Sequence, residues 1–86
     1  IYNVKEFSNV YRIRLFFILK RYDEAIRLSQ GIIENSHNVK QLFQLWEILQ
    51  FNYKNDLANK TKLRILDLIN LKFSFRYHNI SIKNIN

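Results

Sequence analysis

Few residues in this chain have the types and spacing that catalysis requires. It has no cysteine and only one glycine, so it offers neither a thiolate nucleophile nor a glycine-rich phosphate loop. His37 and His78 have no acidic neighbour in sequence. Asp23 and Glu24 are adjacent, and adjacent residues on a helix do not face each other. We therefore expect no enzymatic activity, no cofactor and no metal site.

A basic and aromatic segment is the clearest candidate for binding nucleic acid. The formal net charge is +7, and most of the excess of bases follows residue 53. Phosphates attract such charge, and unpaired bases stack on aromatic rings. The residues predicted to contact nucleic acid are Lys60, Lys62, Arg64, Lys72, Arg76 and Tyr77. The same side chains on a solvated helix would need no function, so RNA contact through residues 54–86 is an alternative hypothesis.

Apolar residues recur at three- and four-residue spacing over most of the chain, which is typical of amphipathic helices. The predicted helices cover residues 4–19, 23–34, 39–53 and 57–71. Asp23 and Glu24 suit the start of the second helix, because the helix dipole favours negative charge there. Asn38 followed by Gln41 is a variant of the capping box at the start of the third. Gly31 indicates a close helix crossing, since glycine is costly inside a helix.

This pattern predicts an all-α fold of two antiparallel helical hairpins, arranged as a repeat or as a small bundle. Residues 1–71 form the helical domain, and residues 72–86 form a basic and aromatic tail. Apolar residues alternate in this tail, as Phe73, Phe75 and Tyr77 do. Such alternation predicts an extended or β-hairpin-like conformation.

The first helix carries more apolar surface than one helical hairpin needs to bury. Its last residues are apolar all round the helix, so they lie either in the core or at an interface with a partner. The candidate protein-interface residues are Leu15, Phe16, Phe17 and Leu19. A role at a membrane surface is disfavoured, and the apolar runs are too short to span a bilayer.

The segment Lys20–Ile26 places an aromatic residue before two acidic residues and a small one. It resembles the turn between the two helices of a tetratricopeptide repeat. Phe16 falls where that family has an aromatic residue, and Lys54–Ala58 echoes the turn 33 positions later, close to the family's period of about 34. Ile13 and His37 depart from the family pattern, which has a small residue and a proline there. The resemblance implies a scaffold that binds other proteins.

We expect a non-enzymatic helical module that binds another protein or itself, as a scaffold or a subunit of a larger assembly. The alternative is a small basic RNA-binding subunit of a ribonucleoprotein, such as an organellar ribosome. The residue usage, rich in Asn, Ile and Lys, is typical of an A/T-rich genome. The chain has no methionine, even at its first position, so we expect that the native start is missing, has been processed, or lies elsewhere in a longer protein. We expect an intracellular location, in the cytoplasm or an organelle.

Overall fold

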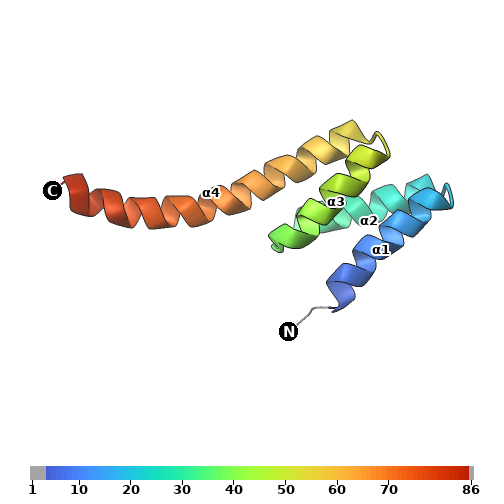
Figure 1. Cartoon of the computed structure of the whole chain (residues 1–86), viewed down its shortest axis with the longest axis horizontal. Helices are drawn as coiled ribbons and strands as arrows, with labels where there is room; N and C mark the ends of the chain where they lie inside the picture. The colour runs from blue at the N-terminus through green and yellow to red at the C-terminus, as the bar shows by residue number, and fades with distance from the viewer. Residues whose placement is uncertain (1–3, 86) are drawn as a thin grey trace.

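All the regular secondary structure within residues 4–85 is helical. The computed structural model describes the backbone of residues 4–85 and the side chains of residues 8–70. The helices are α1 (Val4–Ile18), α2 (Tyr22–Asn35), α3 (Val39–Phe51) and α4 (Asn55–Ile85). No strand occurs within residues 4–85. The prediction of an all-α fold is therefore confirmed (Figure 1).

In the tail the sequence prediction and the structure differ. The helix assignment of α4 continues to Ile85, whereas the alternation of apolar residues predicts an extended or β-hairpin-like conformation for residues 72–86. Phe73 and Tyr77 satisfy helical spacing as well as alternation, and the chain has no proline to end the helix. The side chains of this segment lie outside the described residues.

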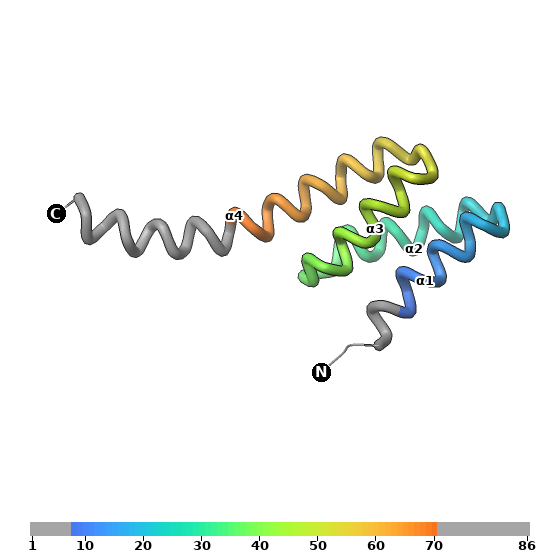
Figure 2. Tube along the Cα trace, viewed as in Figure 1, coloured from blue at the N-terminus to red at the C-terminus, as the bar shows by residue number. Residues whose placement is uncertain are grey.

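Each helix buries one apolar stripe in a common core. α1 packs against α2, and α3 packs against α4 (Figures 1 and 2). α1 also contacts α3, and α2 contacts α4. The largest fully buried apolar side chains are Ile13 of α1 and Leu42, Leu45 and Leu49 of α3. Because fully burying one such side chain contributes about 1.5–3 kcal/mol, this shared core is the main source of stability.

The turn that ends α1 recurs at the end of α3. Lys20 and Tyr53 both have a positive φ, 62° and 59°, the left-handed conformation that commonly ends a helix. The next residue donates its backbone N–H to the carbonyl five residues earlier, Arg21 to Phe16 at 2.8 Å and Lys54 to Leu49 at 2.9 Å. The two turns are therefore equivalent at the 33-residue offset of the sequence echo.

The two turns also contact each other and share a small buried residue. The Lys54 Nζ atom lies 5.2 Å from the centre of the Tyr22 ring, a cation–π contact between one turn and the other. Ala25 and Ala58, in the first turns of α2 and α4, are 0 % and 3 % exposed. A methyl group at each position lets the two helices of a pair approach closely.

The loop between α2 and α3 is fixed by the cap that the sequence predicts. Asn38 Oδ1 accepts a hydrogen bond from the backbone N–H of Gln41 at 3.1 Å. The Ser36 hydroxyl donates to Gln41 Oε1 at 2.6 Å. Together these bonds satisfy polar groups at the start of α3, so the direction in which α3 leaves the loop is set locally.

Gly31 does not mark a close helix crossing, and that prediction is wrong. A Cβ atom built on Gly31 meets no atom within 4 Å. We expect Gly31→Ala to raise the free energy of unfolding by about 0.5–1 kcal/mol, because alanine loses less backbone entropy in a helix. Urea unfolding followed by circular dichroism measures the change. A loss of stability would show that the space beside Gly31 is filled.

Candidate interaction surface

The predicted interface on α1 separates into buried and exposed residues. Phe17 is 5 % exposed and belongs to the core, and Phe16 is half-buried against it. Leu15 and Leu19 are 55 % and 62 % exposed. The apolar run therefore serves the core on one side of α1 and is available to a partner on the other.

A groove runs between the C-terminal halves of α1 and α3. It has a volume of about 560 Å³. Phe17 and Ile48, both buried, contribute its floor. Ile18 of α1 and Phe51 of α3 line it from the two helices, and they are 67 % and 83 % exposed. The groove thus combines a buried apolar floor with two large apolar side chains that the fold leaves in water.

Polar side chains complete the lining of this groove. Arg14 lies on the α1 side, and Glu47 and Asn52 lie on the α3 side. A cation and an anion on opposite walls give the groove a polarity across its width, which would orient a charged partner. An apolar centre with a polar edge is the usual composition of a protein-binding surface.

The sequence prediction missed Ile18 and Phe51, the two most exposed apolar residues of the groove. Ile18 lies inside the apolar run of the first helix, and only the packing direction of α1 shows that its side chain faces outward. Phe51 falls off the core stripe of α3, whose buried members include Leu45 and Leu49. That departure from the stripe is the one sequence signal that marks Phe51.

The basic residues of α4 have different surroundings. Lys60 and Lys62 are exposed. Arg64 instead reaches the loop between α2 and α3, where its Nη2 donates to the carbonyl of Ser36 at 3.2 Å. The same atom lies 2.9 Å from Nδ1 of His37. Lys72, Arg76 and Tyr77 of the predicted nucleic-acid contact lie outside the residues whose side chains are described.

Arg64 therefore ties α4 to the loop between α2 and α3. Because arginine has donors only, Nδ1 of His37 is the acceptor in this contact. The Nε atom of Arg64 is buried and has no hydrogen-bond partner within residues 8–70. Freeing this side chain for a phosphate would break its bonds to the loop, so Arg64 is less available to a ligand than the exposed Lys60 and Lys62.

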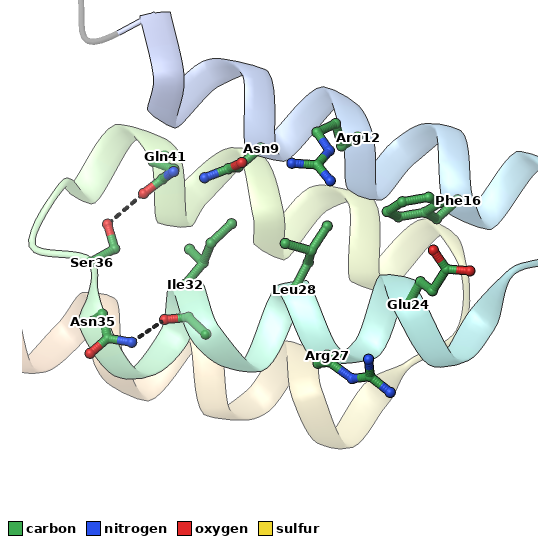
Figure 3. Close-up of a pocket in the computed structure, with 11 residues that line it drawn as sticks. Asn9, Arg12, Phe16, Glu24, Arg27, Leu28, Ile32, Asn35, Ser36 and Gln41 are labelled. Carbon is green, nitrogen blue, oxygen red and sulfur yellow. Dashed lines mark hydrogen bonds between the residues drawn. The ribbon is translucent and has the colours of Figure 1, made fainter.

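A second cavity, of about 490 Å³, lies between α1 and α2 (Figure 3). Phe16, Leu28 and Ile32 contribute an apolar lining. Arg12 and Arg27 come from different helices and lie on different sides of the cavity, without converging on one point (Figure 3). The arrangement offers neither a paired-guanidinium anion site nor a nucleophile with a base.

Two further findings limit the chemistry of the described residues. They contain no group of three or more histidine, aspartate or glutamate side chains placed to hold a metal ion. Among them, no helix is both long and apolar enough to cross a membrane.

Comparison with known proteins gave no match. No family model matches the chain, and neither a curated protein nor a solved structure does. The resemblance to tetratricopeptide repeats thus depends on the turn residues and on the 33-residue offset between the two turns.

Proposed function

We propose that this chain is a non-enzymatic interaction module of two helical hairpins, arranged like tetratricopeptide repeats, that binds another protein in the groove between α1 and α3. The observation that carries the proposal is the exposure of Ile18 and Phe51 beside an apolar floor. Large apolar side chains that cluster on a surface are typical of binding sites, whereas scattered ones are not.

The arrangement of the helices supports a repeat-like binding surface. α1 and α3 occupy equivalent places in the two units, because the turns that follow them have the same geometry 33 residues apart. A groove between equivalent helices of successive units is a surface that such an array repeats along its length. The proposal thus assigns binding to the first helix of each unit and support to α2 and α4.

The chemistry of the groove indicates the kind of partner. Apolar side chains at helical spacing would fill the space between Ile18 and Phe51, as an amphipathic helix does in a hydrophobic groove. The net charge of +7 favours an acidic partner, because complementary charge speeds association. The proposed ligand is therefore an amphipathic helix with an apolar face and acidic flanks.

A peptide-display selection on the folded chain tests this proposal. We expect helical peptides with apolar anchors and acidic flanks to be enriched. Ile18→Glu and Phe51→Glu should each weaken their binding at least about tenfold, since burial of one such anchor is worth about 1.5–3 kcal/mol. Leu15→Glu, a change on the same helix outside the groove lining, is the matched control. Selected peptides that bind both groove variants as tightly as the unchanged chain would contradict the proposal.

RNA binding receives less support than protein binding. Of the predicted contacts with described side chains, Lys60 and Lys62 are exposed, but Arg64 is engaged with the α2–α3 loop. Two lysines on a solvated helix need no ligand to explain them, since lysine is mostly exposed in folded proteins. We therefore keep the protein-binding module as the function that the geometry favours.

A further inference from the structure

The outer face of α4 has no partner within the described part of the chain. α4 turns Leu57, Thr61 and Ile65 into the core. On the opposite side Leu63 and Leu66 are 61 % and 43 % exposed. The outer face of α4 is defined by four exposed residues at spacings of four, three and four. They are Asn59, Leu63, Leu66 and Asn70.

This face is self-complementary when two copies of α4 run antiparallel. Leu63 of one copy then lies against Leu66 of the other, and Asn59 lies against Asn70. Leucine faces leucine and asparagine faces asparagine along the whole contact, because the order Asn, Leu, Leu, Asn is the same in both directions. A two-fold symmetric interface requires this property, since one surface must fit itself.

The charges beside the face are complementary in the same arrangement. Lys60 and Asp67 lie one heptad apart on one flank of the stripe, both are exposed, and neither has an ion-pair partner within residues 8–70. In an antiparallel pair these flanks adjoin, so Lys60 of each copy faces Asp67 of the other. In an antiparallel pair the two helix dipoles also point in opposite directions, which is favourable. In a parallel pair they would point the same way.

The net charge of +7 opposes the approach of two copies. At physiological ionic strength the screening length is about 8 Å, so charges far from the contact repel weakly while the facing Lys60–Asp67 pairs remain. We propose that a second copy of this chain docks on the outer face of α4 to form an antiparallel, two-fold symmetric dimer. The inference does not rest on the proposed function, because this face shares no residue with the groove.

Sedimentation equilibrium over a range of protein concentrations tests the dimer. We expect the unchanged chain to dimerise, and Leu63→Asp combined with Leu66→Asp to remain monomeric with unchanged helicity. Lys60→Glu should raise the dissociation constant at least about threefold, given the modest value of exposed ion pairs. The exchange of both charges, Lys60→Glu with Asp67→Lys, should return the dissociation constant to that of the unchanged chain. An unchanged chain that stays monomeric at millimolar concentration would overturn the inference, as would equal dimerisation of the two-aspartate variant.

Single cysteines give the orientation, because the chain has none of its own. Oxidising a mixture of Asn59→Cys and Asn70→Cys chains should give a disulfide between the two variants. Neither variant alone should crosslink efficiently. A disulfide between two Asn59→Cys chains would require parallel helices and would overturn the antiparallel arrangement.

Discussion

Replacing Leu45 by alanine will lower the free energy of unfolding by about 2–5 kcal/mol. Leu45 is 0 % exposed and lies on α3, which contacts each of the other three helices and packs most extensively against α4. Removing its side chain forfeits the transfer free energy of three carbons and leaves a cavity that neighbouring helices can fill only in part.

The loss is severe for a chain of 86 residues. At about 0.05–0.15 kcal/mol per residue, the whole domain is stable by only roughly 4–13 kcal/mol. One kcal/mol moves the Tm of a domain of this size by about 4–8 °C. Thermal and urea unfolding followed by circular dichroism will measure the change. Leu15→Ala, which removes the same group from an exposed site on α1, should shift stability by less than about 0.5 kcal/mol. Equal losses for the two variants would mean that α3 is not central to the core.

Enlarging Ala25 or Ala58 to leucine will destabilise the fold by about 1–3 kcal/mol. Both residues are buried, Ala25 in the first turn of α2 and Ala58 in the first turn of α4, directly after the two turns of the same geometry. A leucine there must push the paired helix away, because both methyl groups are buried in the core. Since the turns that precede the two positions have the same geometry, the two losses should be alike in size.

Gln30→Leu is the matched control for these two variants. Gln30 is exposed on α2, so the same leucine side chain there should leave the free energy of unfolding within about 0.5 kcal/mol of its original value. A large loss of stability for Ala25→Leu with none for Ala58→Leu would show that the two helix pairs are not equivalent, even though their turns have the same geometry.

The sequence predicts the helices of this chain well because they are amphipathic and because capping and turn residues mark their ends. The cap at Asn38 lies within a few residues of the groups that it satisfies, so it can be recognised before any packing is known. The turns before Ala25 and Ala58 are each formed by neighbouring residues, and the structure gives both turns the same geometry. Local interactions of this kind are encoded at fixed spacings.

Other features depend on packing that no single segment specifies. Gly31 lies beside open space, at the cavity that α1 and α2 enclose between them. Arg64 binds a loop 28 residues earlier in the chain, and nothing near it in sequence indicates that contact. The groove forms only when Ile18 and Phe51 are brought together from two helices. In the tail, one set of residues satisfies both the helical and the strand period, so periodicity alone does not decide between them.

The central claim is that the groove between α1 and α3 is the binding surface. The most direct test is a titration of ¹⁵N-labelled protein with a peptide selected on the folded chain, followed by the backbone amide resonances. We predict that the largest shifts occur at Ile18, Ile48 and Phe51. Shifts confined to Leu63 and Leu66, with the groove resonances unchanged, would contradict the claim.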